Sequence, residues 1–259
     1  MHLLPGRLMR YVRFMLPAGD VIAALRDLPV VDVQELLGND GPVLVVAPHP
    51  DDESLGCGGL IATCCARGRE VHVLIVTDGS GSHPRSRAFP PPRLAALRAD
   101  EARQAVGALG VPPDRLTCLG IRDGAAPHAG HGLRDGVQGI ASYARRHGIG
   151  TICATWKHDP HPDHVAAYRM ASGAAQQTGA RLLSYPVWGW TLPNRAWLPV
   201  EAVSGARIDI TPHLEAKRRA IACHRSQISD LIDDDPTAFR LQPDFLALLT
   251  GRYEVFIHG

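Results

Sequence analysis

Runs of consecutive apolar, mostly β-branched residues recur along the chain, and most are followed by a polar loop and then by a helical pattern. Such runs are typical of strands buried on both faces of a parallel sheet. We predict strands at residues 43–46, 71–77, 116–119, 151–155, 182–187, 207–210 and 253–257, the last a strand or sheet edge. Their alternation with helices predicts right-handed β-α-β units, and hence a Rossmann-like, three-layer α/β/α fold with a mostly parallel sheet.

The helical patterns lie between these strands. The first helix is expected after the glycines of Gly56-Cys-Gly-Gly59, and a short helical lead-in is expected within residues 21–37. Further helices are predicted at residues 93–109, 137–147, 165–171 and 215–226. Residues 78–92 form a long loop rich in Gly, Ser and Pro, which is often functional, so we expect a rim or lid over a ligand.

Length and composition fit one globular domain: the chain has 259 residues, of which 45% are hydrophobic and 20% charged. We expect a lead-in at residues 1–40, a core at about 41–228 and a C-terminal extension at 229–259. No run of about 18 apolar residues predicts a transmembrane helix. Six cysteines without a Cys-x-x-Cys pair favour a reducing, cytoplasmic location.

The net charge and the positions of the arginines indicate which kinds of binding partner to expect. The net charge of +1 gives no electrostatic reason to expect nucleic-acid binding. Near the N-terminus, Arg7, Arg10 and Arg13 alternate with apolar residues, which is compatible with peripheral membrane contact or with an arm packed on its own domain. Assembly into a homo-oligomer is compatible with the sequence.

The first strand is followed by a dense group of ionisable residues, namely His49, Asp51, Asp52 and Glu53. They are expected at the carboxyl end of that strand, where open α/β sheets bind ligands. Three carboxylates so close together repel one another, and a cation is the simplest relief. In extended chain Asp51 and Asp52 would point to opposite sides, so one could bind a metal and the other face water or substrate. The alternative is a solvated acidic turn that caps a helix.

The strand at residues 151–155 is followed by a second such loop, with His161, Asp163 and His164. If a helix starts near Asp163, His161 and His164 lie about one turn apart and can face one pocket. A catalytic zinc ion prefers three protein ligands and one open position. His49, one of the two aspartates and one of these two histidines would complete that set.

The two loops also resemble a known family. His49-Pro-Asp-Asp-Glu53 and His161-Pro-Asp-His164 are similar to the paired signatures of the PIG-L/LmbE-like metal-dependent N-deacetylases. Weaker similarities are Arg98-Ala-Asp-Glu101, Gly120-Ile-Arg-Asp-Gly124 and the segment from Lys217 to Gln227. In order and spacing these matches run from about Val43 to Gln227.

The resemblance implies a site, residue by residue. His49, Asp52 and His164 would bind one divalent cation per chain, zinc or another divalent metal. Asp51 would act as general base on a water, His161 would stabilise the oxyanion, and Asp163 would orient His161. Arg98 would reach the sugar or support the site, and Asp123 would accept hydrogen bonds from sugar hydroxyls. Asp159 stands where some members carry a tyrosine that assists the oxyanion.

The function implied is hydrolytic removal of an N-acetyl group from an N-acetylglucosamine-type sugar on a glycan, lipid or natural-product carrier. A metal-dependent amidohydrolase that acts on a non-sugar N-acyl substrate is the alternative, and a non-catalytic sugar- or metal-binding module is a third reading. Trp188 and Trp190 could pack on sugar rings or in the core. Arg85 and Arg87 could meet an anionic carrier or remain solvated.

Overall fold

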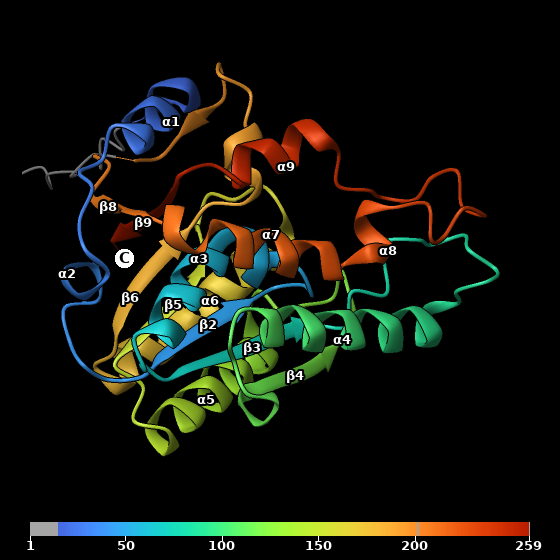
Figure 1. Cartoon of the computed structure of the whole chain (residues 1–259), viewed down its shortest axis with the longest axis horizontal. Helices are drawn as coiled ribbons and strands as arrows, with labels where there is room; N and C mark the ends of the chain where they lie inside the picture. The colour runs from blue at the N-terminus through green and yellow to red at the C-terminus, as the bar shows by residue number, and fades with distance from the viewer. Residues whose placement is uncertain (1–14, 201, 259) are drawn as a thin grey trace, which may run out of the picture.

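The computed structural model describes residues 15–200 and 202–258. The arginine-containing N-terminal segment, and with it the expected membrane contact, lies outside the described residues. Seven strands form one sheet in the order β4-β3-β2-β5-β6-β9-β8 (Figure 1). They are β2 (Val43–Ala47), β3 (Val71–Thr77), β4 (Leu116–Ile121), β5 (Thr151–Thr155), β6 (Arg181–Tyr185), β8 (Gly205–Asp209) and β9 (Tyr253–His258).

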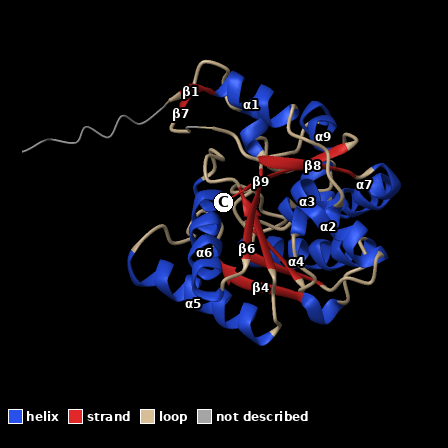
Figure 2. Cartoon of the chain, turned by 90° about the vertical axis from the view of Figure 1, so that its left-hand side faces the viewer, coloured by secondary structure: helices blue, strands red, loops and turns tan. Residues whose placement is uncertain are grey.

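The sheet is mostly parallel, as predicted. Neighbouring strands from β4 to β6 pair in parallel, and β9 pairs antiparallel with both β6 and β8. Strand β9 therefore lies inside the sheet and is not an edge. Helices cover both faces, with α5 (Gly130–Arg146) and α6 (Pro162–Thr178) on one and α3 (Asp52–Ala66), α4 (Pro91–Ala108) and α7 (Leu214–Cys223) on the other (Figure 2).

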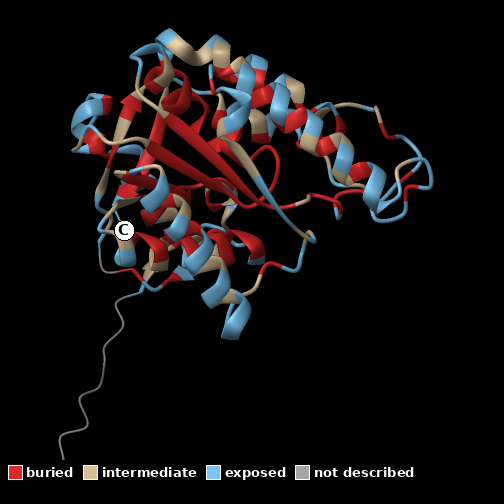
Figure 3. Cartoon of the chain, turned by 90° about the horizontal axis from the view of Figure 1, so that it is seen from below, coloured by how far each residue is buried: buried red, intermediate tan, exposed pale blue. Residues whose placement is uncertain are grey.

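The two faces of the sheet contribute to two separate cores because side chains alternate along a strand. Leu44 and Val46 pack with the residues of α5 and α6, whereas Val43 and Val45 pack with those of α3, α4 and α7. The central strands are buried along their whole length, while the outer sides of the helices are exposed (Figure 3). This double coverage explains the continuous apolar runs in the sequence.

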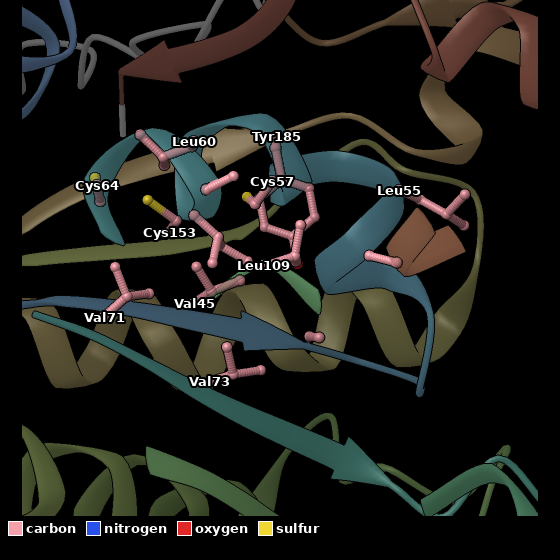
Figure 4. Packing of buried hydrophobic residues seen from close by; sticks show 14 of the residues in the cluster. Val45, Leu55, Cys57, Leu60, Cys64, Val71, Val73, Leu109, Cys153 and Tyr185 are labelled. Carbon is pink, nitrogen blue, oxygen red and sulfur yellow. The ribbon is translucent and has the colours of Figure 1, made fainter. Parts of the chain in front are cut away.

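Helix α3 begins at Asp52, so the expected start after the glycines is wrong. The glycines lie within the helix because they allow it to pack closely on its neighbours. A Cβ atom on Gly56 would lie 2.1 Å from the Tyr185 ring, and one on Gly59 would lie 2.4 Å from Ile210. Figure 4 shows Cys57, Leu60 and Tyr185 in this packed region. Burial of the whole helix outweighs the low helix propensity of glycine.

Other helices also differ from the sequence prediction. The lead-in forms α1 (Ala18–Arg26) and α2 (Val33–Leu37), interrupted by a segment that contains Pro29. Helix α5 begins at Gly130 instead of residue 137, and α9 was not predicted. The remaining elements are β1 (Leu16–Pro17), β7 (Trp197–Leu198), α8 (Arg225–Ile228), α9 (Pro243–Leu249), and the short helices Pro113–Arg115, Trp188–Thr191 and Thr211–His213.

The strand order determines where a ligand site can form. Strand β2 pairs with β3 on one side and with β5 on the other, so the order of the strands reverses beside it. Crevices at such a switch point, outside the carboxyl ends of the strands, are the usual ligand sites of open α/β sheets. Within residues 15–200 and 202–258, no helix has the length and apolarity needed to span a bilayer.

Candidate metal and catalytic site

The polar loops after β2 and β5 meet at this switch point beside a cavity of about 480 Å³. Most of the predicted site residues line it: His49, Asp51, Asp52, Arg98, Asp123 and His161. Asp163 and His164 do not line the cavity and are fully buried. The structure thus brings residues from four separate segments of the chain to one place.

Asp52 lies between two histidines. Its Oδ2 atom is 3.1 Å from His49 Nδ1 and 3.2 Å from His164 Nε2. Asp52 is the first residue of α3, and His164 lies in the first turn of α6. Two helix N-termini therefore position these side chains. Asp51 caps α3 and Asp52 lies within it, so the expected extended chain is not found, yet the two aspartates do contact different partners.

This arrangement fits a divalent cation. In a tetrahedral site with bonds of about 2.0–2.1 Å, neighbouring ligand atoms lie about 3.3 Å apart, close to the separations around Asp52 Oδ2. His164 Nε2 is buried and makes no hydrogen bond although it lies 3.2 Å from Asp52 Oδ2, and the same holds for His164 Nδ1 at 3.2 Å from Asp159 Oδ1. Ligand atoms lie within 4.8 Å of one another in two groups, His49 with His161 and His164, and His49 with Asp123 and Asp163, and Asp52 belongs to neither. The unpartnered His164 nitrogen favours a set that contains His164.

Electrostatics couple these groups. Burial lowers the pKa of His164, but the charges of Asp52 and Asp159 outweigh it and raise that pKa to about 9. Burial likewise opposes charge on Asp52, yet His164 and His49 hold its pKa far below the usual range. Without a cation, His49 and His164 would therefore be protonated and would balance the charge of Asp52. The same carboxylates would attract a metal ion in place of those protons.

Asp51 has a strained backbone. Its φ of 130° is the only positive value at a non-glycine residue in the described part of the chain. Such a conformation costs about 1–3 kcal/mol and persists only where the surroundings enforce it. The Asp51 N–H donates to Glu53 Oε2 over 3.0 Å, and Glu53 in turn pairs with His224. Burial raises the pKa of Asp51 to about 7, although Arg98 opposes the shift.

Arg98 holds this turn in place. Its Nη2 atom donates to Pro50 O over 2.5 Å and lies 3.0 Å from Asp51 Oδ2, while Nη1 donates to Gly79 O over 2.9 Å. The side chain is buried, and the nearby Glu101 carboxylate accepts hydrogen bonds from Ser226. Of the two roles that the resemblance implied for Arg98, these contacts favour support of the site.

Replacement of Arg98 by methionine should lower the free energy of unfolding by about 3 kcal/mol, because two carbonyls and a carboxylate lose a buried partner. Chemical denaturation would measure the change. The matched control is Arg103→Met on the same helix, because Arg103 pairs with Asp100 at the surface and its replacement should change stability by less than about 1 kcal/mol. Equal effects of the two substitutions would contradict the assigned role of Arg98.

Asp163 contacts a different residue from the one expected. Its carboxylate accepts the N–H groups of Gly124 and Ala126 and lies 3.2 Å from His49 Nε2, so it is turned towards His49. His161 is reached by the Asp163 backbone, whose N–H donates to His161 Nδ1 over 3.2 Å. The predicted orientation of His161 by the Asp163 carboxylate is thus corrected, because two backbone amides hold that carboxylate elsewhere.

Asp123 faces the same cavity. Its Oδ1 atom lies 3.2 Å from His49 Nε2, and its Oδ2 accepts the Gly81 N–H over 3.0 Å. Burial opposes charge on Asp123, but the hydrogen bond with His49 outweighs it and lowers its pKa to about 2. An ionised carboxylate at this wall can only accept hydrogen bonds, which suits hydroxyl donors.

Sequence reasoning missed one residue that supports the site. Asp159 Oδ1 lies 3.2 Å from His164 Nδ1, and its Oδ2 accepts the N–H groups of Val187 and Gly189. A carboxylate on the far nitrogen of a ligating histidine is the usual way to orient that ring. The available signal was an aspartate five residues before a predicted ligand, but such a pair has no recognisable sequence pattern.

Three tryptophans that are close in sequence lie in different environments. Trp188 lines the cavity, whereas Trp190 packs in the cluster around α1 and Trp197 is 62% exposed on β7.

Arg85 and Arg87 are exposed and do not line the cavity. Their backbone N–H groups donate to Asp235 and Asp234, which tie the loop after β3 to the segment between α8 and α9.

Comparison with known proteins now decides the family. Residues 44–175, just over half of the chain, match the sequence profile of the family described as PIG-L, GlcNAc-PI de-N-acetylase. The chain belongs to the PIG-L family. It is accordingly an N-deacetylase, a hydrolase of amide bonds, and the resemblance of the two histidine motifs is confirmed. PIG-L deacetylases are metal-dependent, in agreement with the His/Asp group at the cavity.

Individual relatives agree with this placement. The chain is 28% identical to a 1D-myo-inositol 2-acetamido-2-deoxy-alpha-D-glucopyranoside deacetylase of Rhodococcus jostii, over 84% of this chain and 91% of the relative. Its fold is similar to that of N,N'-diacetylchitobiose deacetylase from Pyrococcus horikoshii, with a TM-score of 0.66, 23% identity and coverage of 87% and 86%. A 4-carboxy-2-hydroxymuconate hydratase from Pseudomonas putida also shares the fold, with a TM-score of 0.56, 20% identity and coverage of 71% and 78%. The fold alone therefore does not determine the reaction of this PIG-L protein.

Proposed function

We propose that this PIG-L protein is a zinc-dependent hydrolase that removes the acetyl group from an N-acetylglucosamine-type sugar on a larger carrier. The observation that carries the proposal is the position of Asp51. A strained, buried carboxylate faces the cavity beside a His-Asp-His set that contains a buried, unpartnered nitrogen. Named relatives that act on an acetamido sugar support the sugar class.

His49, Asp52 and His164 would hold the cation. When bound, it would supply Lewis-acid activation of water near neutral pH. The chain's own residues carry the remaining steps of amide hydrolysis, in which water and the N-acetyl group yield acetate and a free amine. Asp51, held by Arg98, accepts the proton of the attacking water as general base.

His161 lines the cavity and has a defined tautomer. Because its Nδ1 accepts the Asp163 N–H, the neutral ring carries its proton on Nε2. Burial lowers the pKa of His161, and the neighbouring His49 and His164 lower it further, which favours this neutral form. The Nε2–H group can then donate to the developing oxyanion of the acetamide. Asp123 accepts hydrogen bonds from sugar hydroxyls at the adjacent wall.

Acetate release from a panel of N-acetylglucosamine derivatives tests the proposal. We expect release that stops when a chelator removes the metal and returns when zinc is added back. Simple N-acyl amines serve as the comparison, because preference for them would support the alternative amidohydrolase on a non-sugar substrate. If a zinc-loaded enzyme released no acetate from any sugar in the panel, the sugar class would be wrong.

A further inference from the structure

The cavity beside the predicted metal residues is lined by two kinds of residue, polar and apolar. The polar wall consists of His49, Asp51, Asp52 and Asp123. The apolar part of the lining, here called the apolar wall, consists of Leu55, Pro160, Pro162, Trp188, Phe239 and Leu241. A cavity of about 480 Å³ is in the range that accommodates drug-sized ligands, which are larger than one sugar ring. The polar wall is occupied by the acetamido sugar in the proposed function, so the apolar wall is available for what the sugar is attached to.

The aromatic residues of the apolar wall pack against one another and against Phe245. The Trp188 ring stacks on Phe245 at 4.1 Å between centroids and 7° between planes, and meets Phe239 at 5.4 Å and 76°. Phe239 is nevertheless 41% exposed, one of few large apolar side chains in the described chain that are left in water. Covering it with an apolar ligand group would remove that surface from water without first reorganising the wall.

Backbone contacts fix the segment that carries Phe239 and Leu241. The Phe239 N–H donates to Ser82 O over 2.9 Å, and the Leu241 N–H donates to Gln227 O over 2.8 Å. Asp234 binds the N–H groups of Arg87 and Ala88, so the segment between α8 and α9 and the loop after β3 are joined. The two project from the same side of the molecule (Figure 1). The apolar wall is thus a built part of the cavity and not a loose loop.

The charges at the cavity oppose an anionic carrier. Among the described residues that line it, Arg98 is the sole arginine or lysine, and its guanidinium donates to Pro50 O, Gly79 O and Asp51. Both Nη atoms of Arg98 are therefore engaged with protein oxygens, and the ionised Asp123 carboxylate would repel a phosphate. The arginines of the neighbouring loop do not line the cavity.

From these observations we propose that the apolar wall binds an apolar, uncharged carrier group attached to the acetamido sugar. This inference rests on the proposed function and specifies its substrate class. It distinguishes this chain's substrate from sugars linked to a phosphate or to a polyol. Phe239 and Trp188 would act as specificity-determining residues that touch the carrier and not the scissile amide.

The test compares three substrates of the zinc-loaded enzyme: methyl and phenyl glycosides of N-acetylglucosamine with the same anomeric configuration, and N-acetylglucosamine 1-phosphate. We expect kcat/KM for the phenyl glycoside to exceed that for the methyl glycoside by about tenfold, mainly through KM, as burial of one aromatic ring implies. The 1-phosphate should be the poorest substrate. Phe239→Ala should remove most of the phenyl-to-methyl preference, and Phe239→Leu should retain part of it.

Trp197→Ala is the control, because this exposed tryptophan lies outside the cavity lining and its removal should leave the phenyl-to-methyl ratio unchanged. Equal kcat/KM for the two glycosides, or a preference for the 1-phosphate, would overturn the inference but leave the deacetylase function intact. An unchanged phenyl-to-methyl ratio of kcat/KM in Phe239→Ala would also overturn the inference and leave the deacetylase function intact. Absence of acetate release from all three substrates would overturn the proposed function itself.

Discussion

Asp51→Asn should lower kcat by roughly a hundredfold to ten-thousandfold and leave the bound metal in place. Asparagine has the same shape as aspartate, and its carbonyl oxygen can still accept from Arg98, but its amide does not take a proton from water. The ligand set of His49, Asp52 and His164 does not include Asp51. The measurement pairs kcat on the best sugar substrate with the zinc content of the same purified preparation.

Two comparisons sharpen this prediction. Asp135→Asn removes a carboxylate from an exposed position on α5 and should change neither kcat nor zinc content. Thermal unfolding of the two variants would show whether the substitution at residue 51 changes the stability of the fold. Nearly full activity of Asp51→Asn would remove this residue from the role of general base, whereas loss of zinc would instead make it a ligand.

The strands could be predicted because their burial is visible in local sequence. Every residue of β2 and β3 is buried, and a strand covered by helices on both faces needs apolar residues at successive positions. The position of the site followed from the same reasoning, because polar residues directly after such strands must lie at the carboxyl edge of the sheet. The same reasoning predicts His49 and His161 at this edge, where both line the cavity.

Helix boundaries were harder to predict where packing outweighs local propensity. Residues 130–136 contain three glycines and little apolar periodicity, yet they form the first turns of α5. A Cβ atom on Gly136 would lie 2.7 Å from Met170 Sδ of α6, so this glycine permits the two helices to approach closely. The benefit of that contact depends on Met170, more than thirty residues later in the chain, and no local window of sequence contains both residues.

Buried charges far apart in sequence could not be paired from the sequence. Lys217 Nζ lies 2.7 Å from Glu254 Oε1, and the two side chains are 1% and 3% exposed. Glu254 also accepts the N–H groups of Gly59 and Leu60 within α3. A lysine or glutamate is normally placed on the surface unless a partner is known, and here the fold supplies the partner. The contact of Asp163 with His49 was missed for the same reason.

His164→Ala should reduce zinc binding by at least about a hundredfold, since even loss of a residue that only orients a ligand costs about tenfold to a hundredfold. The substitution removes the buried Nε2 atom next to Asp52 and leaves two protein ligands instead of three. Zinc content after dialysis against a weak chelator measures the effect without reference to activity. Activity should disappear in parallel and should not return at stoichiometric zinc.

His161→Ala provides the decisive comparison for His164→Ala, because His161 belongs to a competing group of ligand atoms with His49 and His164. If Asp52 is the third ligand, His161→Ala keeps its zinc and loses turnover, since only the donor to the oxyanion is removed. If His161 is the third ligand, both variants lose zinc to a similar extent. His131→Ala, at an exposed position on α5, should retain both properties. Full zinc content in His164→Ala would exclude His164 from the site and leave the group of His49, Asp123 and Asp163 as the metal ligands.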